Sequence, residues 1–477
     1  MASITNDEAA HLLRRMGFGG SPAEIDDLVT RGREGAVDYL LNYQLINNSQ
    51  MDDLLARSFD FSNPLANDGK FNQGEIRRWW FTRMITTRRQ FEEKITLFWH
   101  NHFATSLSKV NDFYMFPQNL KLRQFALVRF DTLLTEVSKD PAMLIWLDNI
   151  TNVRGRPNEN FAREIQELFS LGITDVVTDQ PNYTEQDVKE IARAFTGWTF
   201  RLNRADPFNS TFFENPNNHD NGAKTIYGET LNFDGEDVID RICRRVATGR
   251  YLVKKLFSFF VYPLTSSAAD KATADKFANV YMSSNHSIKD LVRAIFTSDE
   301  FFSARAQLGL IKTPVEYVVG PIRMLGANYN PGLPNQRRDG SLAASTRAMG
   351  MDVFAPPDVA GWDLNLGWVN TAAALTRFNF ANGLASNRPG NDPVGPWLTN
   401  DQLRAFTKSS SKKTVKKFLS VLGPLHPGNS VIKNLRNYLE SDDQGNKVEW
   451  SVTDATIDKK IRGLVHQIMC LPEFGLN

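Results

Sequence analysis

The sequence is poor in cysteine, in excess charge of either sign and in long hydrophobic runs, and each shortage excludes a class of protein. Two cysteines in 477 residues, Cys243 and Cys470, exclude a fold stapled by disulfides, and their apolar surroundings suit free thiols in a reducing compartment. Lys and Arg number 55 against 54 Asp and Glu, so the chain lacks the basic excess typical of nucleic-acid-binding proteins. We therefore expect no nucleic-acid partner.

No stretch approaches the roughly 18–20 apolar residues that a transmembrane helix requires. The most apolar segment, 252–263 (LVKKLFSFFVYP), is too short and contains two lysines. The N-terminus shows no apolar run of secretory length. As written, the sequence predicts a soluble cytoplasmic protein, and a periplasmic or secreted one if a signal peptide has been removed.

Aromatic residues and helical periodicity are abundant. The 33 Phe, 9 Trp and 11 Tyr residues supply enough apolar surface for a sizeable core. Apolar residues recur at helical spacing along most of the chain. Helices are expected over 74–103, 120–137, 160–171, 184–198, 235–247, 251–261, 268–283, 287–296 and 313–325.

Two long segments, 200–235 and 327–370, are rich in Asn, Asp, Pro and Gly and are expected to be loops. Short β-like pieces at 211–213 and 225–227 predict a small hairpin in the first of them. The fold class is therefore mainly α: a large multi-helix body with a small β-hairpin or loop insertion near 200–235. We expect one compact body with four regions, which are an N-terminal helical region (1–200), the insertion (201–235), a central helical region (236–400) and a C-terminal helical region (401–477).

The first candidate site is the segment from Glu93 to Phe103 (EKITLFWHNHF). On a helix, Glu93 and His100 lie seven residues apart and share a face, whereas His102 joins His100 only if the helix ends there. A His-x-His pair is a familiar way to place two imidazoles on a metal, but a third ligand is needed. Metal binding, structural hydrogen bonding and acid–base catalysis all remain open for this segment.

The second candidate is the segment 157–169 (PNENFAREIQELF), in which Asn158 precedes a helix with one polar face. That face carries, at i, i+3, i+4 and i+7 spacing, Asn160, Arg163, Glu164 and Glu167. Two carboxylates beside one guanidinium suit a metal or a protonated base. They suit a structural ladder of ion pairs equally well.

Two loops supply further candidates. The loop 219–224 holds His219, Asp220 and Lys224, which can close over a polar site and add a third imidazole, or can simply be solvated. The segment 356–362 (PPDVAGW) holds Asp358 and Trp362, which either wall a pocket or pin the loop to the core. The set considered for a metal is His100, His102, His219 and Asp220.

Several blocks of sequence, taken together, resemble a known bacterial family. They include HLLRRMGFGGSPAEI, EKITLFWHNHFATS, PNENFAREIQELFSLG, YTEQDVKEIARAFTGW, HDNGAKTIYG and PPDVAGW, and they run in order from His11 to about Asn382. The family is the one called domain of unknown function 1800. The resemblance implies no activity and no role for any residue, although many relatives are secreted and accompany a second, sulfatase-like protein. This sequence departs from them in showing no signal peptide, and at Gln166 and Ser170.

The first function that these observations favour is an enzyme with a polar pocket. It would hydrolyse a polar small molecule or saccharide either by acid–base chemistry or by metal-assisted chemistry, and only the second route would use a divalent metal as cofactor. The catalytic residues would be Glu93, His100, Glu164, Arg163 and Glu167. The substrate-binding residues would be Asn158, Asn160, Lys224, Asp358 and Trp362.

Two alternatives come from other classes of protein. One is a non-catalytic scaffold or assembly protein whose buried polar network only specifies packing. The other is a helical oxidoreductase that holds haem or iron, against which the lack of a paired Glu-x-x-His motif counts.

Overall fold

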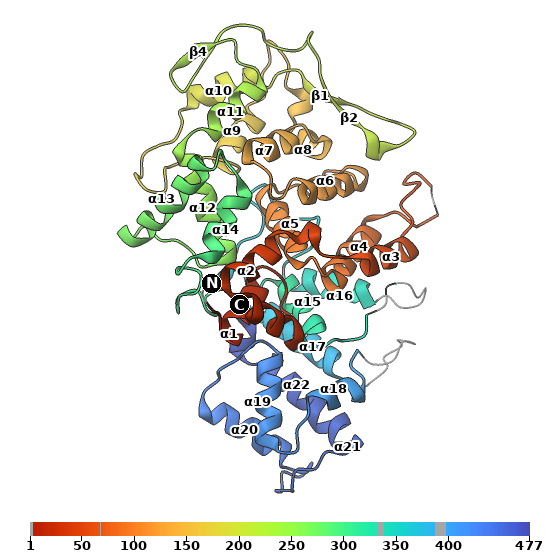
Figure 1. Cartoon of the computed structure of the whole chain (residues 1–477). Helices are drawn as coiled ribbons and strands as arrows, with labels where there is room; N and C mark the ends of the chain where they lie inside the picture. The colour runs from red at the N-terminus through yellow and green to blue at the C-terminus, as the bar shows by residue number, and fades with distance from the viewer. Residues whose placement is uncertain (1–2, 67, 330, 332–337, 387–396) are drawn as a thin grey trace.

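The computed structural model describes residues 3–66, 68–329, 331, 338–386 and 397–477. Figure 1 shows the helices stacked from α7–α11 at one end, through α2–α6 and α12–α17, to α18–α22 at the other end. The first 200 residues form α1 (Asn6–Arg15), α2 (Pro22–Leu41), α3 (Ser49–Ser58), α4 (Gln73–Thr86), α5 (Gln90–His102), α6 (Asp112–Gln124), α7 (Phe130–Ser138), α8 (Pro141–Trp146), α9 (Glu159–Glu167) and α10 (Glu185–Ala194). Short 3-10 turns η1 (Tyr43–Leu45) and η2 (Asn149–Thr151) connect some of them.

The predicted β insertion is confirmed, and it contains two small antiparallel sheets. Strand β1 (Trp198–Arg201) pairs with β2 (Thr211–Glu214) across the turn η3 (Pro207–Asn209), and β3 (Lys224–Ile226) pairs with β4 (Glu229–Leu231). The second hairpin turns at Tyr227 and Gly228, whose φ angles of 49° and 84° are both positive. Positive φ at both central residues is the mark of the type I′ turn, whose twist matches that of the two strands.

The rest of the chain is again helical, and the mainly α fold class is confirmed. The central part forms α11 (Gly235–Cys243), α12 (Val246–Phe260), α13 (Ala268–Ser283), α14 (Ile288–Thr297), α15 (Pro314–Met324), α16 (Arg338–Ala348), η4 (Asn365–Trp368) and α17 (Thr371–Ala385). The C-terminal part forms α18 (Asn400–Phe406), α19 (Ser411–Val421), α20 (Asn429–Leu439), α21 (Asp454–Thr456), the π-type turn η5 (Ile457–Ile461), α22 (Arg462–Met469) and η6 (Pro472–Gly475).

The prediction of one continuous helix over 74–103 is wrong, because α4 and α5 are separate helices. The backbone of Thr87 is extended, and its Oγ1 accepts a hydrogen bond from Arg89 N at 2.9 Å. Arg88 N donates to Asn48 Oδ1, also at 2.9 Å. Side chains therefore satisfy donors that a continuous helix would have bonded internally. The pattern likewise missed the break between α6 and α7, and helix α16 inside the expected loop 327–370.

The buried hydrophobic side chains form one cluster that extends from Ile4 to Phe474. Helices from early and late parts of the chain pack together in it: α2 lies against α14, and α4 against α15 and α16. The two ends of the chain lie side by side (Figure 1), where an Arg15 guanidinium nitrogen donates to the Asn477 carbonyl at 2.9 Å. The division into four regions stays a prediction.

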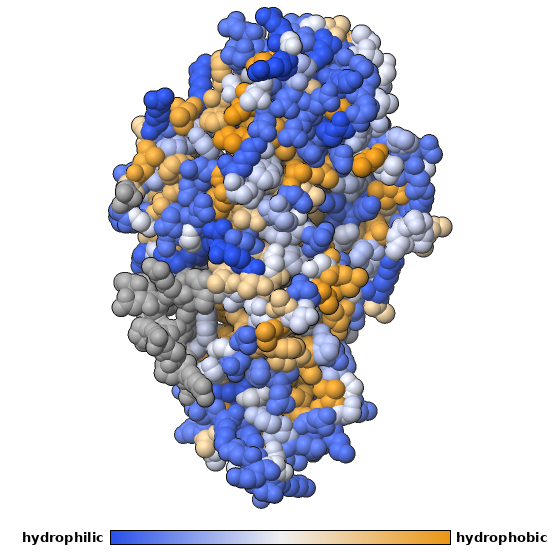
Figure 2. Space-filling model, turned by 180° about the vertical axis from the view of Figure 1, so that it is seen from behind, coloured by the Kyte–Doolittle hydropathy of each residue, from blue (hydrophilic) through white to orange (hydrophobic). Residues whose placement is uncertain are grey.

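The outer surface is mostly hydrophilic. Figure 2 shows the rear face largely covered by hydrophilic residues, with apolar residues gathered in separate patches. Within the described residues, no helix has both the length and the apolar character needed to cross a membrane.

Candidate functional site

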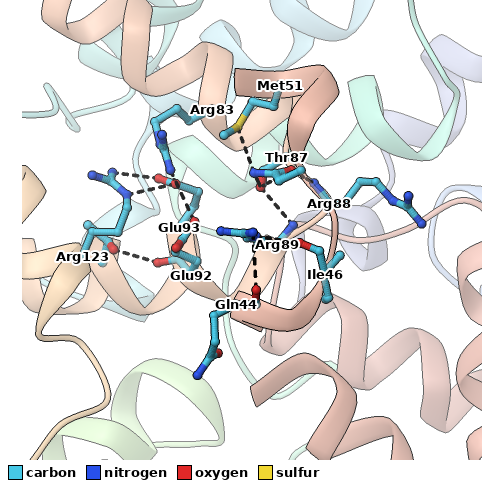
Figure 3. Close-up of polar contacts among 12 residues, drawn as sticks. Gln44, Ile46, Met51, Arg83, Thr87, Arg88, Arg89, Glu92, Glu93 and Arg123 are labelled. Carbon is cyan, nitrogen blue, oxygen red and sulfur yellow. Dashed lines mark hydrogen bonds and ion pairs between the residues drawn. The ribbon is translucent and has the colours of Figure 1, made fainter. Parts of the chain in front are cut away.

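Glu93 lies on α5 at the centre of a buried ion network with α4 and α6 (Figure 3). Its carboxylate is fully buried and accepts hydrogen bonds from Trp80 Nε1 at 3.0 Å, from Arg83 Nε at 2.7 Å and from Arg123 at 2.9 and 3.0 Å. Burial by itself would raise the pKa of Glu93, but the two guanidinium groups outweigh it and hold the pKa at about 2. A carboxylate that is saturated with donors is a poor proton acceptor, so these contacts favour a structural role.

His100 and its neighbour Asn101 hold the segment that contains Asp358 and Trp362. His100 Nε2 accepts a hydrogen bond from the backbone N–H of Phe354 at 3.0 Å, and Asn101 Oδ1 accepts one from Trp362 N at 2.7 Å. The Trp362 ring is buried, and its centre lies 5.6 Å from the centre of the His100 ring. Burial lowers the pKa of His100 to about 3, so the imidazole is neutral at physiological pH.

Asp358 is exposed, and its Oδ1 accepts a bond from Ala360 N at 2.9 Å inside the same loop. Gly361 then approaches α5 so closely that a Cβ atom there would lie 2.4 Å from the Asn101 carbonyl oxygen. The segment 356–362 is therefore held to the core, as one of its two interpretations expects.

His102 faces away from His100. Its Nε2 donates to the Phe169 carbonyl at 2.9 Å, and its ring packs among Phe98, Trp99 and Phe103. Because α5 continues through His102, two residues of separation place the imidazoles about 200° apart around the helix axis. The pair therefore does not converge on one ion. Burial, with a smaller effect from Lys255, lowers the pKa of His102 to about 3.

The loop 219–224 binds to α10 and to itself. His219 Nδ1 donates to Thr196 O at 2.9 Å, and Asp220 accepts from Arg193 at 2.8 and 3.2 Å. Lys224 Nζ donates to two carbonyls of its own loop, those of Asp220 and Gly222, at 2.6 and 3.0 Å. These contacts hold the loop within the β insertion and against α10. Among the described residues, no hydrogen bond joins its side chains to those of α5.

The structure thus does not bring the proposed metal set together. Among the residues that it describes, no three His, Cys, Asp or Glu side chains are placed to hold a metal ion. His100 and His102 also both use Nε2 in hydrogen bonds to the backbone, which does not favour either as an axial haem ligand.

On α9, the amide side chains and the arginine serve the packing of the helix. Asn158 caps the helix by accepting from Asn160 N at 3.0 Å, and the Asn160 side chain donates to Leu147 O at 3.3 Å. Arg163 forms a two-bond pair with Glu185 at 2.8 and 2.9 Å, at the start of α10. The guanidinium therefore points to a neighbouring helix and does not bridge Glu164 and Glu167.

Glu164 and Glu167 remain as two carboxylates without a cation between them. Both are half-buried; Glu167 accepts a hydrogen bond from Tyr183 Oη at 3.1 Å, whereas the Glu164 carboxylate has no hydrogen-bond or ion-pair partner among the described residues. Burial, followed by the charge of Glu167, raises the pKa of Glu164. This is the one pair among the predicted catalytic residues that keeps accessible acid–base groups.

Sequence reasoning missed two tyrosines close to this pair, Tyr183 and Tyr251, and a lysine beside the second of them, Lys255. Tyr251 Oη donates to Leu168 O at 2.9 Å, directly beyond Glu167, and Lys255 Nζ lies 5.9 Å from the centre of the Tyr251 ring. Burial raises the pKa of Tyr251 and, with the charge of Lys254, lowers that of Lys255. The sequence did carry one signal, since two lysines interrupt the apolar segment 252–263.

Comparison with known proteins places these residues in a family. A family model described as "Protein of unknown function (DUF1800)" matches residues 11–476, which include every candidate residue above. Searches among curated proteins and among solved structures gave no match. The resemblance expected from the sequence blocks is therefore confirmed over nearly the whole length, and the chain belongs to the DUF1800 family.

Proposed function

We propose that the protein hydrolyses a polar small molecule or saccharide by acid–base catalysis at the carboxylate pair Glu164 and Glu167. One observation carries this proposal: a half-buried Glu164 carboxylate without a partner among the described residues lies one helical turn from Glu167, which is bonded to Tyr183. Side chains at i and i+3 have Cβ atoms roughly 5–6 Å apart, so one small substrate can contact both.

The two carboxyl groups have different surroundings, as acid–base hydrolysis requires. The raised pKa of Glu164 favours its protonated form, which suits a general acid that donates to a leaving group. Glu167 then acts as the base that activates water, and the Tyr183 hydroxyl orients it.

We propose Lys255 as the source of positive charge, because it lies beside Tyr251, whose hydroxyl bonds to the carbonyl of Leu168, next to Glu167 in the chain. It is half-buried on α12 and has no hydrogen-bond or ion-pair partner among the described residues. An unpaired ammonium at the edge of a site stabilises negative charge that develops during the reaction. We assign this role to Lys255 because the earlier candidates are engaged elsewhere, Arg163 with Glu185 and Lys224 with carbonyls of its own loop.

The test is turnover of chromogenic glycosides and carboxylic esters by the native chain and by Glu164→Gln and Glu167→Gln. Each substitution is expected to lower kcat/KM at least about 100-fold, the usual minimum for loss of a general acid or base. Glu159→Gln, on the same helix but outside the pair, is the matched control and should keep native activity. Equal turnover by all variants, or none by the native chain, would contradict the proposal.

The scaffold alternative is favoured by a different observation, the saturation of Glu93 by Trp80, Arg83 and Arg123. A network of this kind specifies how helices pack without performing chemistry. If this is the main function, Arg123→Ala lowers stability while the Glu164 and Glu167 variants change nothing measurable.

A further inference from the structure

An apolar cavity of about 420 Å³ lies between α15, α17 and the C-terminal segment 469–476, far along the chain from the α9 carboxylates. Its walls include Tyr317, Trp368, Phe378 and Leu471, and its described lining contains no Asp or Glu. Cavities of roughly 300–1,000 Å³ with mainly apolar walls and a few polar groups are typical of small-molecule sites.

One wall of this cavity carries the guanidinium of Arg377. The residue is only 8% exposed, and its carbon centre lies 4.8 Å from the Tyr317 ring centre. One nitrogen donates to the Lys312 carbonyl at 2.7 Å, and no carboxylate lies within ion-pair distance among the described residues. A buried charge without a counterion is costly, so the cavity favours an anion that can pair with it.

A further donor borders the same space. Asn370 uses its Oδ1 to cap α17 by accepting from Ala373 N at 2.8 Å, which leaves its amide N–H groups as donors. Two donor side chains, Arg377 and Asn370, in a lining without an acidic residue favour a ligand whose head group consists of acceptor oxygens.

The mouth of the cavity is apolar on the outside as well. Val369 and Phe378, which line it, are 63% and 45% exposed, and Leu366 and Leu375 beside them are also largely exposed. An apolar rim around a cationic interior fits a ligand with two unlike ends. From this arrangement we infer that the cavity binds a small monocarboxylate with an apolar chain or ring, its carboxylate on Arg377 and its apolar part against Tyr317, Trp368 and Phe378.

This inference does not depend on the proposed hydrolysis. The probe is decanoate, titrated calorimetrically into the full chain. Three comparison compounds separate the contributions of the two ends: decanol lacks the charge, decyltrimethylammonium reverses it, and acetate lacks the chain. Decanoate is expected to bind with 1:1 stoichiometry, decanol roughly tenfold or more weakly, and the other two not at all.

Two variants locate the site. Arg377→Met keeps the apolar stem and removes the charge, so it should weaken decanoate roughly tenfold or more and leave decanol unchanged. Ala374 is half-buried on α17 and lines the cavity, so Ala374→Phe places a ring in the cavity and should weaken both ligands. Arg404→Met removes a half-buried arginine outside the cavity, which pairs with Asp454, and is the matched control for a change of net charge.

Cys470 gives an independent readout, because its half-buried thiol lines the cavity while Cys243 is fully buried elsewhere. Bound decanoate should slow alkylation of Cys470 by N-ethylmaleimide, measured by mass spectrometry, and this protection should disappear in Arg377→Met. This readout applies even if a variant folds poorly, since protection is first measured on the native chain.

Three results would overturn the inference. The first is equal binding of decanoate and decyltrimethylammonium. The second is unchanged decanoate affinity in a folded Arg377→Met. The third combines two observations: the native chain is a dimer that the substitution Leu375→Ser dissociates, and the dimer shows no saturable binding of decanoate. In that case a second copy of the chain, and not a ligand, would cover the apolar rim.

Discussion

At the residue scale, neighbours in three dimensions decide what each polar side chain does. Arg163, Glu164 and Glu167 share a helix face, as their spacing predicts, yet Arg163 bonds to Glu185, at the start of α10. His100 and His102 are both histidines of one short motif, yet they bond to backbone groups on opposite sides of α5. The sequence identifies these groups as unusual but does not show which residues they bond to, and these residues lie up to 254 positions away.

The buried imidazole of His102 gives a pH-dependent stability. Its pKa is about 3 in the folded chain against 6.5 for a free histidine, so between these values the unfolded chain binds the proton more tightly. The stabilisation is therefore complete above pH 6.5 and is lost as the pH falls towards 3. We expect His102→Gln to reduce the slope of unfolding free energy against pH, between pH 6 and 4, by about 1.4 kcal/mol per unit.

Urea unfolding at several pH values measures this slope. His426→Gln is the matched control, because His426 lies at the surface and pairs with Asp7. An unchanged slope in the His102 variant would mean that the imidazole is solvated in the folded chain.

The Glu93 network gives a prediction at neutral pH. Arg123→Ala removes one of the two guanidinium groups that neutralise a fully buried carboxylate, and breaking a buried pair in this way costs about 3–5 kcal/mol. Chemical denaturation measures the loss. Arg88→Ala, an exposed arginine beside the same network in Figure 3, should change the unfolding free energy by less than about 0.5 kcal/mol.

At the element scale, local pattern predicted helices well and their ends poorly. The expected helix 268–283 has the bounds of α13. The expected helix 184–198 contains α10, which begins with a capping box formed by Thr184 and Asp187. The break between α4 and α5 was missed because it is stabilised by Asn48, which lies 40 positions earlier in the chain and accepts a hydrogen bond from Arg88 N. A periodic pattern contains no information about such a distant partner.

Two glycines differ in whether their surroundings leave room for a Cβ atom. Gly361 has a φ of 85° and lies against the Asn101 carbonyl, so Gly361→Ala should lower stability by about 1–3 kcal/mol or more. Gly383, exposed within α17, has open space around it, and Gly383→Ala should raise stability by about 0.5–1 kcal/mol. Thermal melting of both variants measures the opposite signs, and a rise for Gly361→Ala would disprove the close contact.

At the scale of the whole molecule, the helical class and the β insertion follow from the sequence, whereas the packing of distant segments does not. The first 200 residues look like a separate helical region, but α2 packs on α14 and α4 packs on α15 and α16. Likewise, the Arg377 cavity joins α15, α17 and the C-terminal segment, and no motif in any one of them indicates it.

These long-range contacts predict that the proposed regions do not fold alone. A fragment of residues 1–200 would expose the faces of α2 and α4 that α14, α15 and α16 cover. We expect it to lack a cooperative thermal transition, whereas the full chain should show one. Circular dichroism melting of the two chains is the measurement, and a sharp transition of the fragment would establish an independent domain.

The bond between Arg15 and Asn477 joins positions 462 residues apart. A ribosome makes α1 well before the C-terminal segment, so this helix leaves the exit tunnel long before the segment that it will touch has been translated. Contacts between positions so far apart form late in folding. We therefore expect the nascent chain to expose the buried side of α1 during most of its synthesis, which makes that side a natural place for a chaperone to bind.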